Sequence, residues 1–353
     1  MRSAVLLVVV ALVACSGGST SLKASSPSPT VQPQASADAS SVRSSAPNAS
    51  PATIPNPVVT VTSAGRSLTC RLPVIWSQEN AGSTVQKEGF LTFPTGSVSE
   101  APSAPANSLF YDRAYSKWLP VWRQNVSPDG RRYAYTEGNP AVDTHGKLHL
   151  VDIASGTDRV LYSGAPVYWV IDFASEGIYV SEGVGSSRSL WLENPAGGLP
   201  HMITRSIAYP VIAGGAAWGL AFNPADPHPG PGGIDGPWNE LTRLDLTTGA
   251  STKLFYRPGT TILPLGEDQG GDLLVGVLTS FAGPEEVWLI TPTTTMRKLG
   301  TFDAPLAQTL AAADRHGLWF SGAGKVWLYA GGAFAVVASL SADSFAVAGG
   351  CIP

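Results

Sequence analysis

Leu148-His149-Leu150-Val151-Asp152 is the first of five copies of one short phrase. Each copy runs hydrophobic residue, any residue, Leu, and is followed by a polar or turn residue, a tight turn and a second apolar stretch. The other copies are Leu190-Trp191-Leu192-Glu193, Leu241-Thr242-Arg243-Leu244-Asp245, Val287-Trp288-Leu289 and Val326-Trp327-Leu328. The last Leu of each copy follows the previous one by 42, 52, 45 and 39 residues.

This spacing indicates a repeat architecture. A period of about 40–50 residues made of alternating strands and turns predicts an all-β chain folded as a β-propeller. Each repeat then forms one blade, a four-stranded antiparallel meander whose strands A to D run outward from a central axis. Because propellers host many unrelated functions, the architecture alone does not assign a function.

We expect about six blades. In the first, residues 117–121 form part of strand A, and 131–138, 147–153 and 159–163 form strands B, C and D. The next four blades cover residues 167–205, 209–257, 260–301 and 306–340. The sixth is shared by the two ends of the chain: 345–352 supplies strand A, and 68–76, 89–93 and the region of Val98 supply the rest. Sharing a blade in this way closes the ring and removes open strand edges. The count becomes seven if 58–62 and 97–116 hold further strands.

The most specific local motif is Ser127-Pro128-Asp129-Gly130, which precedes Arg-Arg-Tyr-Ala-Tyr. Asp-Gly favours a tight turn between strands A and B, and Pro presets the backbone before it. Alternation after the turn places Tyr133 and Tyr135 on one face of the strand. Together with residues 148–156 and 160–162, the motif resembles the TolB-type, WD-repeat-like propeller blade. The resemblance implies a periplasmic or extracellular binding propeller, but it names no partner, because the rest of the chain departs from the TolB pattern.

The first 57 residues predict export and a membrane anchor. Residues 1–14 combine Arg2 with an apolar run that is too short to span a bilayer, as in a secretory signal peptide. Leu12-Val13-Ala14-Cys15 resembles a bacterial lipobox, which implies cleavage before Cys15, a lipid on its sulfur and an extracytoplasmic protein held on a membrane of the cell envelope. The alternative is an ordinary signal peptide with an incidental cysteine. The Ser-, Pro- and Ala-rich residues 15–57 read as a disordered tether, which leaves 58–353 for the propeller.

Charge and cysteine content narrow the partners. With 22 Lys and Arg against 26 Asp and Glu there is no basic stripe, which argues against nucleic acid and against electrostatic docking on anionic lipid. Membrane contact should therefore come through the lipid alone, and we expect a monomer. Cys70 and Cys351 stand at the two ends of the folded region. In an exported protein such a pair suggests a disulfide, and the alternative is two free buried thiols.

The connections between strands predict a working face. The C–D turns are minimal, whereas the B–C connections at 138–146, 181–187, 222–238 and 280–284 are long and fall at one end of the disc. Loops on a rigid scaffold commonly carry binding, although neutral loop drift would give the same pattern. The 222–238 loop reads either as a contact finger that ends in an aromatic anchor or as a plain surface loop. The candidate contact residues are Asp143, His145, Glu182, Asp226, His228, Asp235 and Trp238.

Catalytic motifs are missing from the sequence. Gly-x-Ser-x-Gly, His-Glu-x-x-His and Cys-x-x-Cys do not occur, so we predict no catalytic residue, metal or cofactor. The expected function is non-enzymatic binding of, or a scaffold for, a protein, peptide or envelope component. Two alternatives stay open: a lactonase- or hydrolase-type enzyme with a divalent metal at the channel mouth, and a structural spacer or sensory ectodomain. The carboxylates considered for that metal are Asp143, Glu182, Asp226, Asp235 and Glu285.

Overall fold

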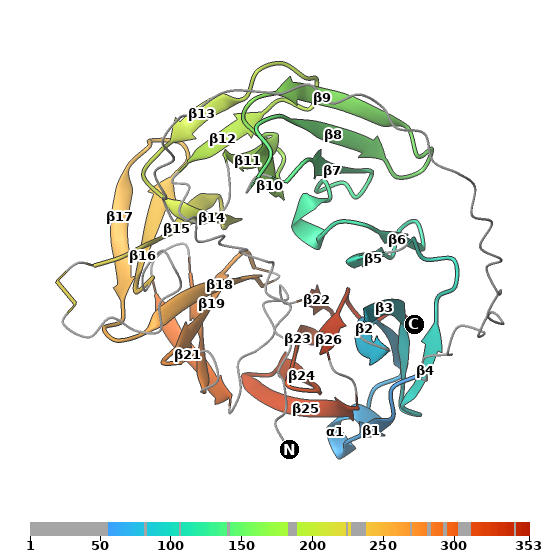
Figure 1. Cartoon of the computed structure of the whole chain (residues 1–353). Helices are drawn as coiled ribbons and strands as arrows, with labels where there is room; N and C mark the ends of the chain where they lie inside the picture. The colour runs from blue at the N-terminus through green and yellow to red at the C-terminus, as the bar shows by residue number, and fades with distance from the viewer. Residues whose placement is uncertain are drawn as a thin grey trace, which may run out of the picture.

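The protein is built almost entirely of antiparallel β-sheets that lie in chain order around a common centre (Figure 1). The computed structural model describes residues 56–80, 83–105, 107–139, 142–182, 189–223, 225–226, 238–268, 270–280, 284–291, 295–302, 312–341 and 344–353. Within these residues there are seven sheets, and no helix is long and apolar enough to cross a membrane. The arrangement is propeller-like, as the repeat spacing predicts.

Three sheets are complete four-stranded meanders that match the predicted repeats. They consist of β10 (Tyr168–Phe173), β11 (Ile178–Glu182), β12 (Leu190–Glu193) and β13 (His201–Thr204); β14 (Ala208–Ala213), β15 (Ala216–Ala221), β16 (Glu240–Asp245) and β17 (Ser251–Tyr256); and β18 (Thr261–Glu267), β19 (Leu273–Leu278), β20 (Glu285–Ile290) and β21 (Met296–Phe302). The middle strand β19 is buried on both faces and is a continuous apolar run, whereas the outer strands β17 and β21 each begin with three exposed residues, most of them polar.

The two ends of the chain meet in two neighbouring sheets. One contains β26 (Ser344–Val347), β2 (Cys70–Asn80), β3 (Ser83–Phe93) and β4 (Ser97–Glu100) in that order. The other contains β22 (Ala312–Asp314), β23 (Gly317–Gly322), β24 (Lys325–Ala330) and β25 (Ala333–Leu340), with β1 (Val59–Val61) added beside β25. A short helix, α1 (Ser63–Arg66), connects β1 to β2. The structure contains the disulfide between Cys70 and Cys351 that the sequence suggests.

The first repeat departs from its predicted layout. Its outer strands are present as β7 (Arg132–Glu137), β8 (Gly146–Asp152) and β9 (Asp158–Gly164), but residues 117–121 do not form their inner partner. Instead β6 (Lys117–Leu119) pairs with β5 (Phe110–Asp112) in a separate two-stranded sheet, and η1 (Arg123–Asn125) follows it. At the position expected for the inner strand, an isolated antiparallel β-bridge joins Val126 to Tyr133 of β7.

An aromatic cluster accounts for this change of partner. Phe90, Tyr111 and Trp118 meet with ring centroids 5.0 to 5.8 Å apart, and they pack against Ile75 and Ile352 of the sheet shared by the chain ends. Burying three aromatic rings stabilises the position of β6 more than a few strand hydrogen bonds would. The aromatic residues of 110–118 therefore bind β5 and β6 to the preceding sheet.

The core lies between neighbouring sheets. Trp76, Trp218 and Trp319 are among its largest fully buried side chains. Trp288 packs on Phe255 of the preceding sheet, with ring centroids 5.5 Å apart. Trp327 similarly contacts Phe302 at 5.4 Å. Trp288 and Trp327 therefore pack between neighbouring sheets, whereas Trp191 packs on Tyr168 of its own sheet.

Candidate functional site

The Ser-Pro-Asp-Gly motif builds the turn that precedes β7. Ser127 Oγ donates to Asp129 Oδ1 at 2.6 Å, and the backbone N–H of Arg131 donates to the same oxygen at 3.0 Å. These two hydrogen bonds lower the pKa of Asp129. Gly130 has φ 69°, a left-handed conformation that glycine adopts without strain. The motif acts as a turn-building unit, and it fixes which face each β7 side chain occupies.

The sheet β7–β8–β9 has two chemically different faces. Leu148 and Leu150 belong to the core that this sheet shares with β10 and β11. Tyr133 and Tyr135 lie together on the opposite face, as predicted, with ring centroids 6.2 Å apart. His149 pairs with Tyr135 in the strand register and therefore shares that second face. One face is core, and the other is aromatic and polar.

The neighbouring sheet covers only part of the aromatic face. Leu119, the last residue of β6, and Val121, which follows β6, pack against Tyr133 and Tyr135. The β5–β6 sheet has two strands and lies toward the centre of the molecule (Figure 1). On the face beside it Tyr133 and Tyr135 are partly exposed, Glu137 and Asp158 are exposed, and His149 is buried. A cavity of about 300 Å³ opens at this boundary. It is lined by Pro120, Tyr133, Tyr135, Val151, Gly156 and Asp158.

A hydrogen-bond network continues from the cavity across the exposed face. Tyr135 donates through its hydroxyl to Asp158 Oδ2 at 2.8 Å, and His149 Nδ1 lies 2.9 Å from Asp158 Oδ1. His149 Nε2 lies 3.1 Å from Glu137 Oε2. Lys147 Nζ donates to both Glu137 oxygens at 3.1 and 3.0 Å. The rings of Tyr135 and His149 are stacked, 4.5 Å apart and 17° from parallel.

Two carboxylates dominate the polar groups of this network. The two ring nitrogens of His149 face Asp158 and Glu137 at 2.9 and 3.1 Å, and Lys147 Nζ pairs with Glu137. Burial, together with the bond to Asp158, raises the pKa of Tyr135 to about 12, so its hydroxyl remains a donor at neutral pH. Burial acts to raise the pKa of Asp158, but the hydrogen bonds from His149 and Tyr135 outweigh it and lower that pKa.

The sequence analysis did not identify this network, because it considered the residues of each strand separately. The available signal was the pairing of β7 with β8. Once Tyr135 is assigned to the non-core face, the residue opposite it must lie on that face too. The position of Asp158 is harder to predict from the sequence. It belongs to β9, and the β8–β9 pairing shifts register between Leu148 and His149.

Two predicted contact residues lie in the loop that joins β7 to β8. Asp143 is exposed, and its Oδ2 accepts the backbone N–H of Asn139 at 2.6 Å, so that it closes its own loop. His145 is also exposed, and its Nδ1 lies 3.0 Å from Thr144 Oγ1. Both residues extend from the sheet that carries the network and remain candidates for contact.

Asp226 and Trp238 are not available as surface contacts. Asp226 is only 7% exposed, and its Oδ2 accepts from Asn239 Nδ2 at 2.6 Å and from the Gly259 N–H at 2.9 Å. Trp238 is only 8% exposed and packs on Tyr209 with ring centroids 5.3 Å apart. The indole of Trp238 fills the core beside β14–β17. Asp226 and Trp238 thus fix the two ends of the 222–238 loop to the core.

The predicted residues do not form one site within the part of the chain that the structure describes. Glu182 ends β11 and forms an ion pair with Arg205, whose Nη2 lies 3.7 Å from Glu182 Oε2. His228 and Asp235 lie outside the described residues. The carboxylates considered for a divalent metal are likewise not assembled among the described positions: Glu285 is buried within its sheet, against Gly276.

A second group of charged residues lies on the innermost strands. Asp172 is on β10, Glu267 ends β18, and Arg123 belongs to η1. Burial and the nearby charge of Glu267 raise the pKa of Asp172 to about 7. Burial also raises the pKa of Glu267, although Arg123 and the backbone of Gly214 oppose this. A carboxyl group that titrates near neutrality can exchange protons with a ligand, so this group is a candidate for acid–base chemistry.

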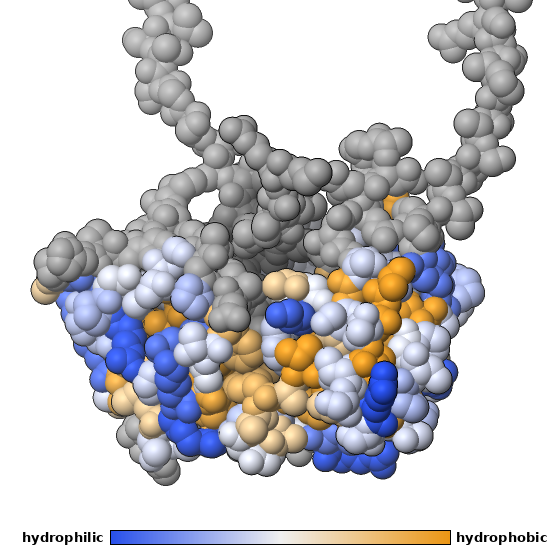
Figure 2. Space-filling view, turned by 90° about the horizontal axis from the view of Figure 1, so that it is seen from below, coloured by the Kyte–Doolittle hydropathy of each residue, from blue (hydrophilic) through white to orange (hydrophobic). Residues whose placement is uncertain are grey.

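A second cavity, of about 370 Å³, lies between β21 and β25. Phe302, Trp327 and Phe334 line it together with Lys325. Figure 2 looks at this rim of the molecule, where apolar residues reach the surface between hydrophilic patches. Residues 303–310, which directly follow β21, lie outside the described part of the chain, so we assign this cavity no ligand.

Comparison with known proteins finds similarity in solved structures only. No family profile and no curated protein sequence matches the chain. It is similar to an oligogalacturonate lyase in complex with manganese, with 11% identity over 69% of this chain and 68% of that one and a TM-score of 0.43. It is similar to TolB from Acinetobacter baumannii, with 10% identity over 76% of this chain and 63% of that one and a TM-score of 0.42. It is also similar to an acylaminoacyl peptidase from Pyrococcus horikoshii, with 11% identity over 77% of this chain and 46% of that one and a TM-score of 0.41.

Proposed function

We propose that the protein is a lipid-anchored, extracytoplasmic β-propeller that binds a carbohydrate component of the cell envelope without transforming it. The observation that carries the proposal is the exposed aromatic and polar face of β7–β8–β9, with its adjoining cavity of about 300 Å³. Such a volume lies at the lower end of the range for small-molecule sites and suits one sugar-sized group.

The chemistry of the face favours a polyhydroxylated ligand. Tyr133 and Tyr135 offer apolar ring surface beside polar tips, a combination that suits the mixed apolar and hydroxylated surface of a sugar. Asp158 and Glu137 supply acceptors for hydroxyl groups, and Lys147 supplies a donor.

In the proposed architecture the ring has seven positions, and β5–β6 is a reduced blade at one of them. A complete four-stranded blade there would cover the outer face of β7–β8–β9, as the core faces are covered elsewhere. The reduced blade therefore creates the binding surface. Cys15 would carry the lipid, and residues 15–57 would hold the propeller away from the membrane. The disulfide between Cys70 and Cys351 suits an oxidising compartment outside the cytoplasm.

The test is calorimetric titration of the full-length protein with soluble saccharides released from the cell envelope. Asp158→Asn and Tyr135→Phe each remove one hydrogen-bonding partner from the face and should weaken binding about ten-fold or more. Tyr162→Phe is the matched control, because that ring packs on Tyr168, away from the cavity, with centroids 5.1 Å apart. If both face variants bind like the wild type, or if no saccharide fraction binds, the proposal is wrong.

A second candidate function is a hydrolase- or lyase-type enzyme, favoured by the Asp172, Glu267 and Arg123 group. The same titration separates the two functions. If the wild type consumes the saccharide, and this activity is lost in Asp172→Asn but kept in Asp158→Asn, the result would support the enzyme. If no saccharide fraction is bound and none is consumed, the result would favour the structural spacer.

A further inference from the structure

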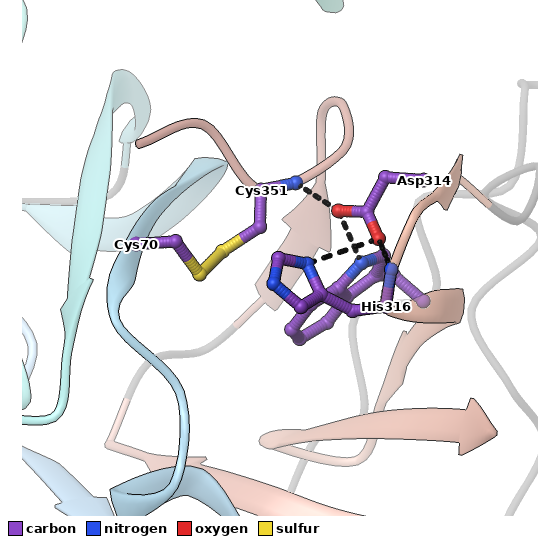
Figure 3. The surroundings of a disulfide bond; sticks show 5 residues. Cys70, Asp314, His316 and Cys351 are labelled. Carbon is purple, nitrogen blue, oxygen red and sulfur yellow. Dashed lines mark hydrogen bonds and ion pairs between the residues drawn. A yellow bond between two sulfur atoms is a disulfide. The ribbon is translucent and has the colours of Figure 1, made fainter.

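The disulfide that joins the chain ends lies beside a histidine (Figure 3). Cys70 begins β2, Cys351 follows β26, and His316 lies in the turn between β22 and β23. The two sulfur atoms and one ring nitrogen of His316 all lie within 4.8 Å of one another. Both cysteines are buried, whereas the His316 side chain is partly exposed. Among the residues that the structure describes, this is the one group of three potential metal ligands.

Asp314 orients this group. Its Oδ1 lies 3.3 Å from His316 Nδ1 and also accepts the His316 backbone N–H at 2.7 Å. Its Oδ2 accepts from Trp319 Nε1 at 2.8 Å and from the backbone N–H of Cys351. In Figure 3 the other ring nitrogen of His316 lies on the side of the sulfur atoms. A carboxylate behind a histidine whose second nitrogen is directed at the ligand position is a common arrangement around protein-bound zinc.

The positions of the two cysteines do not depend on the disulfide alone. Cys351 is held by Asp314, and its neighbour Ile352 exchanges two backbone hydrogen bonds with Arg71 at 2.7 and 2.9 Å. Cys70 pairs with Phe93 in the β2–β3 ladder. None of these contacts involves the S–S bond, so we expect the reduced sulfurs to stay near each other and near His316.

We propose that the reduced protein binds Zn²⁺ through the thiolates of Cys70 and Cys351 and through Nε2 of His316. A dithiol reductant supplies two electrons and two protons, becomes a disulfide itself and leaves two thiols on the protein. Each thiol releases its proton as its bond to zinc forms. A fourth, water-bound position is expected on the exposed side of His316.

The geometry suits this metal. Tetrahedral zinc with Zn–S bonds of about 2.3 Å needs sulfur atoms roughly 3.8 Å apart. The Cα atoms of the two cysteines are 5.7 Å apart, so rotation of the side chains can provide this separation without moving the backbone. Two soft thiolates and an imidazole form a donor set that selects zinc over calcium or magnesium. The disulfide then acts as a redox gate, since the oxidised sulfurs cannot bind the ion.

The test uses the full-length protein, with Co²⁺ as a spectroscopic probe for zinc. The disulfide is reduced without oxygen by a water-soluble phosphine, which takes an oxygen atom from water to become the phosphine oxide. The reduced protein should bind one equivalent of Co²⁺ with a thiolate-to-cobalt charge-transfer absorption, and Zn²⁺ should displace it. The oxidised protein should show neither effect. His316→Ala and Asp314→Asn should each weaken binding about 10–100-fold, and His201→Ala, an exposed histidine on β13, should not.

A thermal-unfolding measurement tests the site even if reduction of the disulfide partly unfolds the protein. Zn²⁺ should raise the melting temperature of the reduced protein, or restore its circular dichroism, and should leave the oxidised protein unchanged. Equal Co²⁺ affinity in wild type and His316→Ala would overturn the site. Failure of zinc to stabilise or refold the reduced chain would overturn it as well. Both results are independent of saccharide binding.

Discussion

At the scale of single residues, Glu193 is the most unusual side chain in the described core. It is 0% exposed, and neither carboxylate oxygen has a hydrogen-bond partner. Burial raises its pKa from an ordinary value of 4.5 to about 7. An unpaired buried carboxylate is costly when charged, so Glu193 holds its proton in the folded protein at mildly acidic pH.

This proton makes the stability of the protein pH-dependent. The folded-state pKa of Glu193 is raised, so its stabilising contribution is present below about pH 4.5 and is lost as the pH rises through about 7. The loss amounts to roughly 3 kcal/mol as an upper estimate. Glu193→Gln cannot titrate at this position and should show a smaller decline, whereas the part that comes from the raised pKa of Asp172 should remain. Urea unfolding at about pH 5 and about pH 8 measures the difference.

The control for that measurement is Glu176→Gln, which removes an exposed carboxylate from the turn after β10. It should keep the pH dependence of the wild type, with a change in stability within about 0.5 kcal/mol. An identical loss of stability with pH in wild type and Glu193→Gln would show that Glu193 is ionised in the folded state.

At the scale of elements, the pairing of β1 with β25 depends on a close approach by α1. Thr62 caps this helix, and the Thr62 N–H donates to Val337 O at 3.1 Å. Gly65 then packs directly against β25: a Cβ there would stand 2.2 Å from Val337 O and 2.7 Å from Val61 Cγ1. Only a residue without a side chain lets the helix lie this close to the strand.

Gly65→Ala should therefore destabilise the protein by about 1–3 kcal/mol, as overpacking does in well-packed interiors. The expected readout is a lower urea midpoint with an unchanged slope. Ser63→Ala, an exposed change in the same helix, should shift the midpoint little. A Gly65→Ala protein as stable as the wild type would mean that β1 and α1 can detach from β25 at no cost.

Element prediction succeeded where local pattern and spacing decide the structure. The apolar phrases ending at Leu192, Leu244 and Leu289 lie on strands of four-stranded sheets, and the phrase ending at Leu328 lies on a strand of the five-stranded sheet, because each must bury side chains between neighbouring sheets. It failed for β6, which leaves its repeat because Trp118 packs with Phe90 from another sheet. Contacts between residues so far apart in the sequence leave no periodic signal.

The site residues show the same division. The Ser127 turn and the shared face of Tyr133 and Tyr135 follow from local chemistry and were predicted. Trp238 was misassigned because its loop is rich in proline and glycine, whereas its own position is set by packing on Tyr209. The His149 network depends on a three-strand register that a single strand pattern does not contain.

At the scale of the whole molecule, the disulfide joins positions 281 residues apart. In the chain-entropy account, a link across so long a loop stabilises the folded state by roughly 5 kcal/mol as an upper estimate. The double variant Cys70→Ser/Cys351→Ser should therefore unfold at a clearly lower urea concentration than the wild type. Equal unfolding midpoints would show that the β2–β26 and β1–β25 pairings hold the chain ends together by themselves.

The order in which these strands leave the ribosome has a consequence for biosynthesis. β2 is made near the beginning of the folded region, yet its partner β26 is the last strand in chain order. Until residues 344–347 have been synthesised, β2 presents an unpaired edge on which another chain could add a strand. The complete fold therefore requires the complete chain: a prematurely terminated chain keeps this unpaired strand edge, exposes the thiol of Cys70, and becomes a substrate for proteases and chaperones.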